Sequence, residues 1–303
     1  MIKNVVIILV LFFFYIESSL AKILIKYKVG DQIVTNFDIL DEKKYLIFFR
    51  PSLSSLKEKE ILKLSENSLI REIIKKKELD LIFNNLNNYN FINDLKKNLF
   101  KFKGVSTEKE FKELTKRNNL EYDRIIQKLK YEGLWNELIF KKFGKSIKIN
   151  EKKLKDELSI KLKNDKKYEY NISELLFDLE KNENIKDKLK EIFSNDFKIS
   201  ASKYSISNSA NNGGEIGWIK ETLLSEDLNK ILNELKVGEV SEPIKYPNGY
   251  LLLKINDKRE MKQIIDINKE LIELVKFEKN KQLNQFSLLY FKKLKQNIKI
   301  DEY

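Results

Sequence analysis

The chain has 303 residues, 42% of them hydrophobic, which is enough for two modest domains with real cores and excludes a wholly disordered protein. Its formal charge is +12, but basic and acidic residues are interleaved along most of the sequence. No helix-turn-helix or zinc-finger motif is present, so no nucleic-acid partner is predicted. Cysteine and histidine are both absent, which removes disulfides, the favoured zinc ligands and histidine-based catalysis. A carboxylate-only magnesium or calcium site is the alternative, but no calcium-loop pattern is present, so we expect no metal and no other cofactor.

The first 21 residues have the layout of a secretory signal peptide. Lys3 gives a positive start, Val5 to Ile16 forms a short apolar run, and Ser19-Leu20-Ala21 supplies the small residues of a cleavage site. The run of roughly a dozen residues is shorter than the about 20 that a transmembrane helix needs. We expect cleavage after Ala21 and a mature protein outside the cytoplasm. Retention of the segment as a membrane anchor is the alternative.

The next part of the chain is predicted to be a short hairpin followed by helices. Residues 23–27 and 33–34 have the character of two strands around the turn Gly30-Asp31-Gln32. Thr35 is the expected N-cap of the first helix, with Asp38 three residues on. That helix should end before Pro51. Further helices are predicted over 56–85, 91–102, a short stretch opening at Thr107, 121–143 and 151–163.

The periodicity changes after residue 165. Residues 168–179 alternate like a strand, 185–193 and 196–203 are predicted helices, and a glycine-rich turn follows. A helix over 225–235 and a strand over 250–255 come next. Strands separated by helices indicate a small α+β domain around an antiparallel sheet. The last segment, 264–298, is one long helix whose apolar side must be buried, most simply against the N-terminal helices.

Three segments of this second part together resemble the parvulin (PpiC/rotamase) prolyl isomerase family. They are Gly213 to Trp218, Leu235 to Ile244 and Asn248 to Ile255. Earlier in the chain, Val29 to Asp38 and Asn118 to Leu134 are similar to the SurA-type periplasmic chaperones. In that family the C-terminal helix folds back to complete the N-terminal core.

The resemblance implies an α+β fold with a mostly helical N-terminal part. The division that it implies is a signal peptide at 1–21, a helical chaperone domain at 22–165, a parvulin-like domain at 166–260, and a C-terminal helix at 261–303 that packs on the N-terminal domain.

The resemblance also points to cleft residues, and here the sequence departs from the family. Active parvulins normally carry two histidines in the cleft, and the matching positions are Glu174 and Leu251. Ser207 matches the position that is usually cysteine or aspartate. No catalytic residue is therefore assigned, and these three positions also fit a solvent-facing carboxylate, a core residue and a turn cap. The resemblance implies peptide binding by the hydrophobic positions, which are Leu224 and Leu228, with Trp218 beside the sheet.

The function that the resemblance implies is an ATP-independent periplasmic chaperone. Its partners would be unfolded outer-membrane or secreted polypeptides, with a transient contact to the outer-membrane assembly machinery. Candidate client contacts are aromatic residues that also fit a core: Phe48, Phe49, Phe91, Phe100, Phe102, Trp135 and Phe140. One alternative is an active prolyl isomerase, because twisting a prolyl bond needs no covalent step. Another is an envelope scaffold with no client.

Overall fold

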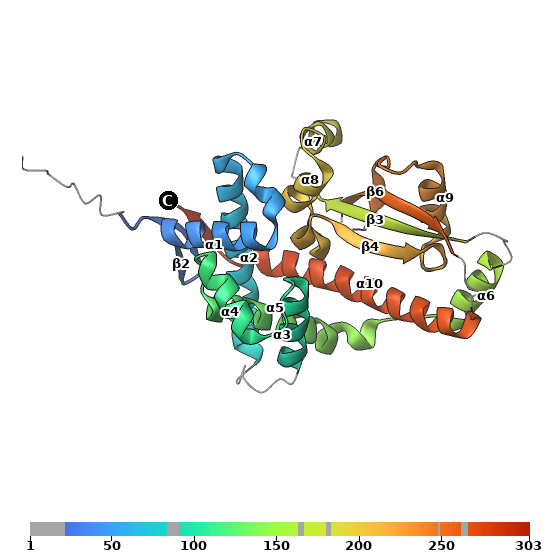
Figure 1. The fold of residues 1–303 in the computed structure, drawn as a ribbon, viewed down its shortest axis with the longest axis horizontal. Coiled ribbons are helices and arrows are strands. Elements are labelled where there is room, and N and C mark those ends of the chain that lie inside the picture. Colours follow the sequence, from blue (N-terminus) through green and yellow to red (C-terminus); the bar gives the residue numbers. More distant parts are fainter. Residues whose placement is uncertain (1–21, 84–90, 163–166, 180–182, 248, 262–265) are drawn as a thin grey trace, which may run out of the picture.

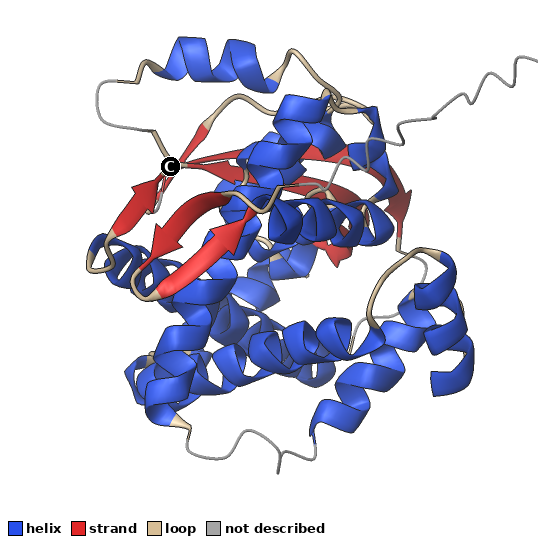
Figure 2. Cartoon of the chain, turned by 90° about the vertical axis from the view of Figure 1, so that its left-hand side faces the viewer, coloured by secondary structure: helices blue, strands red, loops and turns tan. Residues whose placement is uncertain are grey.

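The protein is described by a computed structural model over residues 22–83, 91–162, 167–179, 183–247, 249–261 and 266–303. The predicted signal peptide lies outside these residues. Helices make up most of the described chain, and the strands form two antiparallel sheets, which confirms the predicted α+β class (Figure 2). None of the described helices combines the length and hydrophobicity needed to cross a membrane.

The two ends of the described chain meet in a three-stranded sheet. Strand β1 (Ile25–Val29) pairs antiparallel with β2 (Gln32–Thr35), as the hairpin pattern predicts. Its other edge is taken by β7 (Ile300–Glu302), a strand that the sequence pattern did not predict. The C-terminus is therefore held beside the N-terminal hairpin (Figure 1).

Side-chain caps set the starts of several predicted helices. Thr35 and Asp38 form a capping box at the start of α1 (Asn36–Phe49), as the sequence predicts. Thr107 forms another at α4 (Glu108–Arg117), and Asn150 caps α6 (Glu151–Lys161). The remaining helical elements of this part are η1 (Pro51–Ser55), α2 (Glu58–Ile82), α3 (Phe91–Phe102), α5 (Tyr122–Phe143) and η2 (Gly144–Ser146). The last predicted residues of the helix over 56–85 lie outside the described residues.

The second sheet has four antiparallel strands in the order β4-β3-β6-β5. The two predicted strands are its central pair, and β4 and β5 are the edges that the sequence pattern did not predict. The strands are β3 (Tyr168–Phe177), β4 (Glu215–Lys220), β5 (Ile244–Tyr246) and β6 (Gly249–Glu260). The helical elements between them are α7 (Ile185–Ile192), α8 (Phe197–Tyr204), η3 (Asn208–Asn212), η4 (Glu221–Leu223) and α9 (Glu226–Glu234).

Both faces of this sheet are covered. On one face, Leu175, Phe177 and Leu252 pack with residues of α7 and α8. On the other face, Leu176 and Leu253 pack with residues of α9 and the segment after η4. The alternation of neighbours such as Leu175 and Leu176 between the two faces follows from the period of two in a strand. The sheet is therefore a central layer with helical elements on both sides.

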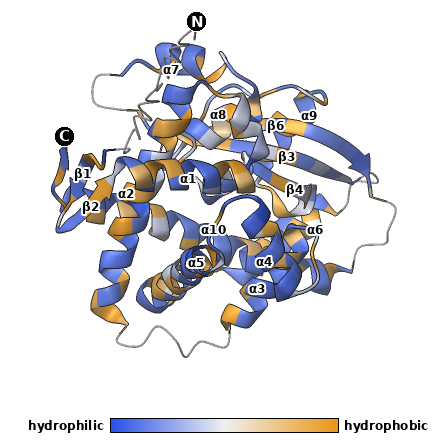
Figure 3. Ribbon diagram, turned by 60° about the vertical axis from the view of Figure 1, so that its left-hand side comes forward, coloured by the Kyte–Doolittle hydropathy of each residue, from blue (hydrophilic) through white to orange (hydrophobic). Residues whose placement is uncertain are grey.

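The long helix α10 (Ile267–Gln296) runs from the four-stranded sheet to the N-terminal helices (Figure 1). Near its C-terminal end, Ser287 accepts a hydrogen bond of 2.8 Å from Nε1 of Trp135 in α5. Tyr290 stacks on the same indole, with ring centroids 5.9 Å apart. Hydrophobic and hydrophilic residues are interspersed along the helices (Figure 3). One side of α10 thus completes the core that α2 and α5 form.

Candidate functional site

Three of the hydrophobic positions assigned to the cleft lie together. Leu224 and Leu251 are buried, with 3% and 5% of their surface exposed, in one cluster with Leu176 and Leu253, which we call the leucine cluster. Leu228 of α9 is partly buried and packs against this cluster. The side chain at the position of the second histidine is therefore part of the core, which fits the reading of Leu251 as a core residue.

The two polar cleft positions also lie together. Glu174 in β3 accepts hydrogen bonds from the hydroxyl groups of Ser207 and, at 2.8 Å, Ser209. Ser207 is the N-cap of η3, and its hydroxyl in turn accepts from the Ser209 backbone N–H. Ser209 was not assigned from the sequence, although serine is common in such local turns because its hydroxyl can bond to nearby backbone groups. The Glu174 carboxylate thus connects η3 to β3 through hydrogen bonds and stabilises the position of η3.

Trp218 is not joined to these residues. Its indole is 38% exposed on β4, whereas the next residue, Ile219, is buried in the leucine cluster. Neighbouring residues of a strand point to opposite faces. The guanidinium of Arg259 lies 4.0 Å from the centroid of the indole ring, and it also pairs with Glu169 at 2.6 Å. The structure therefore places Trp218 under an arginine, away from the leucine cluster.

Helix α10 covers the leucine cluster. Phe277 and Leu288 of α10 pack directly against it. At one end of the cluster Glu270, which is 3% exposed, accepts a hydrogen bond from Thr222. At the other end the side-chain amide of Asn208 in η3 lies 3.4 Å from that of Asn284, within hydrogen-bonding distance. The hydrophobic positions are thus packed under a helix.

Lysine side chains hold α10 and α6 beside the segment 220–224. The ammonium of Lys220 lies 2.8 Å from the carboxylate of Glu270 and 2.6 Å from that of Glu273. Lys161 of α6 donates to the backbone oxygens of Thr222 and Leu224. Burial lowers the pKa of Lys161, because the ammonium group loses hydration there. The backbone oxygens offset part of that loss.

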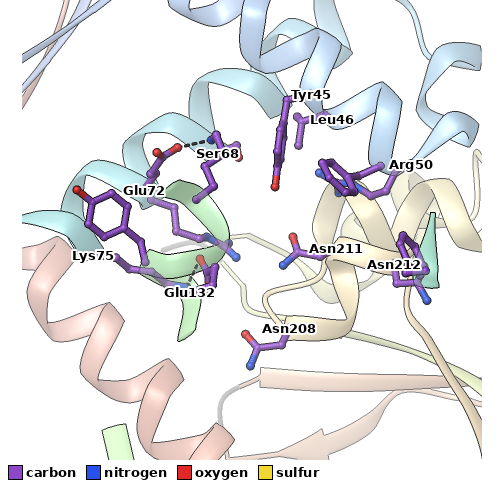
Figure 4. A pocket seen from close by; sticks show the side chains of 15 residues that line it. Tyr45, Leu46, Arg50, Ser68, Glu72, Lys75, Glu132, Asn208, Asn211 and Asn212 are labelled. Carbon is purple, nitrogen blue, oxygen red and sulfur yellow. Dashed lines mark hydrogen bonds and ion pairs between the residues drawn. The ribbon is translucent and has the colours of Figure 1, made fainter. Parts of the chain in front are cut away.

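An open pocket of about 400 Å³ lies elsewhere, between the N-terminal helices and η3 (Figure 4). This volume is within the usual range of ligand sites, about 300–1,000 Å³. One wall comes from α1, α2 and α5 and the other from η3, whose Asn208, Asn211 and Asn212 line it. The pocket joins residues that are far apart in the sequence, and no local pattern indicates it.

Six charged side chains are among the residues that line this pocket. Lys75 pairs with Glu132 at 2.8 Å, and Lys128 pairs with Glu72. Lys128 also lies 2.7 Å from Glu42, which is fully buried behind the wall. Two arginines of the lining, Arg50 and Arg71, have no carboxylate within ion-pair distance among the residues that the structure describes.

The candidate client contacts divide into two groups. Phe48, Phe100 and Trp135 are buried core residues, and Phe49 and Phe91 are partly buried. Phe102 of α3 and Phe140 of α5 are 58% and 57% exposed. Only the last two present large rings to solvent.

Comparison with known proteins shows what the chain is similar to. Residues 153–257 match the PPIC-type PPIase (rotamase) domain family. The chain is 29% identical over 168 residues to the chaperone SurA of Pseudomonas putida, which covers 52% of this chain and 39% of that protein. It is 31% identical over 181 residues to the foldase PrsA of a Geobacillus species, which covers 57% of this chain and 62% of that protein.

A solved structure is also similar. It comes from work on PEB4 and Cj1289, described as SurA-like chaperones of Campylobacter jejuni, with 18% identity, coverage of 92% of this chain and 98% of that one, and a TM-score of 0.36. The chain spans less than two thirds of the length of the SurA and PrsA proteins named above. The prediction from the motifs is confirmed: this is a SurA- and PrsA-like protein that carries a PpiC-type parvulin domain.

Proposed function

We propose that the protein is an ATP-independent chaperone for unfolded exported polypeptides and that its parvulin domain does not isomerise prolyl bonds. The observation that carries this proposal is the covered cleft. Leu251 stands in the core where the family has a histidine, and Leu224 is 3% exposed in the same cluster, against which Phe277 and Leu288 of α10 pack. A peptide would have to displace packed side chains of this cluster to reach Leu224. The names of the related chaperones and foldases support a role in protein folding.

The proposal also covers where the protein acts, which polypeptides it binds and how the chain divides into domains. The signal-like sequence of residues 1–21 supports export to the periplasm. Unfolded outer-membrane β-barrel proteins are suitable clients because their strands alternate apolar and polar residues. Contact with the outer-membrane assembly machinery belongs to the same proposal. In this division, residues 22–165 together with the helix in 261–303 bind clients, and 166–260 are the parvulin-like domain.

An aggregation assay tests the chaperone role. Denatured outer-membrane β-barrel protein is diluted out of urea with or without the purified protein, without ATP, and light scattering is recorded. We expect the protein to lower the scattering, because exposed rings such as Phe102 and Phe140 offer apolar contacts to the unfolded chain. The double variant Phe102→Ser/Phe140→Ser should protect less well.

Phe193→Ser is the matched control, because Phe193 is a similarly exposed ring, 53%, that follows α7. It should protect as the unaltered protein does. Equal scattering with and without the unaltered protein would remove the proposed function. Unchanged protection by the double variant would place the client contacts outside α3 and α5, and an equal loss in both variants would show that the contacts are not confined to these two helices.

A second candidate function is an active prolyl isomerase, which the match to the PPIC-type family favours. The fold alone does not carry an activity, because activity depends on the residues of the site. The hydrogen-bonded Glu174 and the buried Leu251 are the residues that oppose this candidate.

A further inference from the structure

Two guanidinium groups face the pocket between the N-terminal helices and η3. Arg50 is 8% exposed, and its Nη1 donates a long hydrogen bond, 3.3 Å, to the backbone oxygen of Ala210. Arg71 lies over the ring of Phe291, 5.6 Å from its centroid, and makes no hydrogen bond or ion pair with any described residue. A guanidinium carries five N–H donors, so both groups retain unused donors.

The other charges of the pocket are satisfied. Lys75 is paired with Glu132, and Lys128 with Glu42 and Glu72. Four basic and two acidic side chains line the pocket, so the lining itself carries an excess of positive charge. The excess resides in the two arginines.

Burial makes this excess costly. It lowers the pKa of Arg50 to about 10, and it lowers that of Arg71 as well, because both guanidinium groups lose hydration. An anion bound in the pocket would offset the hydration that the two guanidinium groups have lost. Guanidinium groups bind planar carboxylates with two parallel hydrogen bonds, which makes a carboxylate the best-matched anion.

The remaining lining suits a peptide. The side-chain amides of Asn208 and Asn211 face the pocket from the η3 side (Figure 4) and can both donate to and accept from a peptide backbone. The rings of Phe49 and Phe102 supply apolar contact. Phe102 is also one of the exposed rings proposed to bind clients, so the pocket adjoins that surface.

We propose that this pocket binds a carboxylate of the client polypeptide, through Arg50 and Arg71, and so selects segments with an acidic side chain or a free C-terminus. The inference rests on the proposed chaperone function and names the client feature that this site recognises.

Peptide binding by the full mature protein tests the inference. The probes are three short fluorescent peptides of the same alternating aromatic and polar sequence. The first has one central Glu and an amidated C-terminus, the second has Gln there and a free C-terminus, and the third has Gln and an amidated C-terminus. We expect one or both of the carboxylate peptides to bind roughly tenfold more tightly than the neutral one, the size expected for charge-assisted hydrogen bonds. Which of the two gains affinity identifies the source of the carboxylate.

Arg71→Gln should remove this preference, because it deletes a guanidinium that holds no other polar partner in the described chain. Arg117→Gln is the control, since Arg117 is an exposed arginine of α4 and the change in charge is the same. Circular dichroism and the urea midpoint verify that both variants are folded. The comparison among the peptides themselves needs no variant, so it stands even where a variant does not fold.

The outcomes separate the two proposals. Equal binding of all three peptides, or a preference that Arg71→Gln leaves unchanged, would overturn the carboxylate site and leave the chaperone function intact. No binding of any peptide, together with no protection in the aggregation assay, would overturn the proposed function itself.

Discussion

Trp135→Ala is expected to lower the free energy of unfolding of the helical part by about 3–5 kcal/mol, the usual loss when a large buried aromatic side chain is removed. The indole is 1% exposed and lies in the core shared by α2, α5 and α10. Its Nε1 donates to Ser287, and its ring stacks on Tyr290. The substitution therefore removes packing and also leaves the Ser287 hydroxyl without this donor.

Urea unfolding followed by circular dichroism measures the loss. Trp135→Phe keeps one six-membered aromatic ring but removes the indole N–H and the rest of the bicyclic ring, so it should cost less than Trp135→Ala, about 1–2 kcal/mol. Trp218→Ala is the control, because Trp218 is 38% exposed, and it should change the midpoint little. A cost for Trp135→Ala no larger than that for Trp218→Ala would mean that α10 does not dock on α5 as described.

Gly214→Ala is expected to destabilise the parvulin domain by about 3 kcal/mol or more, the sum of a strained backbone and an overpacked contact. Gly214 has φ +81°, a region that L side chains rarely adopt. A Cβ atom there would overlap the backbone oxygen of Glu174 and come within 2.8 Å of Cβ of Ala201. The Gly214 oxygen also accepts the Glu174 backbone N–H at 2.8 Å, so the turn before β4 cannot simply move away from β3.

Gly217→Ala supplies the matched comparison. Gly217 has φ +88°, but an added Cβ would meet no atom within 4 Å, so only the backbone strain, about 1–2 kcal/mol, should appear. Fluorescence of Trp218 in a Trp135→Phe background reports the unfolding of this domain alone, since the chain has two tryptophans. Similar midpoints for the two glycine variants would show that the close approach of Gly214 to Glu174 is not tight in solution.

The helices and their starts could be predicted because the information is local. The capping boxes at Thr35 and Thr107, and Asn150 at its helix start, each lie within a few residues of the groups they satisfy. The class of the fold could be predicted because the spacing of hydrophobic residues changes from helical to strand-like after residue 165. The parvulin motifs indicated the second part because the glycines at 213 and 214 meet steric demands that few other residues meet.

The missed strands have weak local patterns. Strand β4 follows the glycine turn directly and contains Gly217, so its sequence resembles the turn that precedes it. Strands β5 and β7 have three residues each, too few for an alternation to be recognised. All three depend on longer neighbouring strands for their hydrogen bonds.

The cover over the cleft depends on long-range packing. Helix α10 has apolar residues on more than one side: Phe286 and Tyr290 face the N-terminal helices, whereas Phe277 and Leu288 pack on the leucine cluster. The sequence pattern indicated a buried side but not two separate partners. The pocket that contains Arg50 and Arg71 is likewise formed by residues from α1, α2, α5 and η3, which only the fold brings together.

Cis–trans isomerisation of an Xaa-Pro peptide by the purified mature protein tests the central claim most directly, with a parvulin that has both cleft histidines as the positive control. We expect no acceleration over buffer, even at high protein concentration, because the cleft has no histidine and Leu224 is buried in the cluster against which α10 packs. Acceleration that Leu224→Ala abolishes would contradict this account. It would show that α10 moves off the leucine cluster and that the domain works as an isomerase.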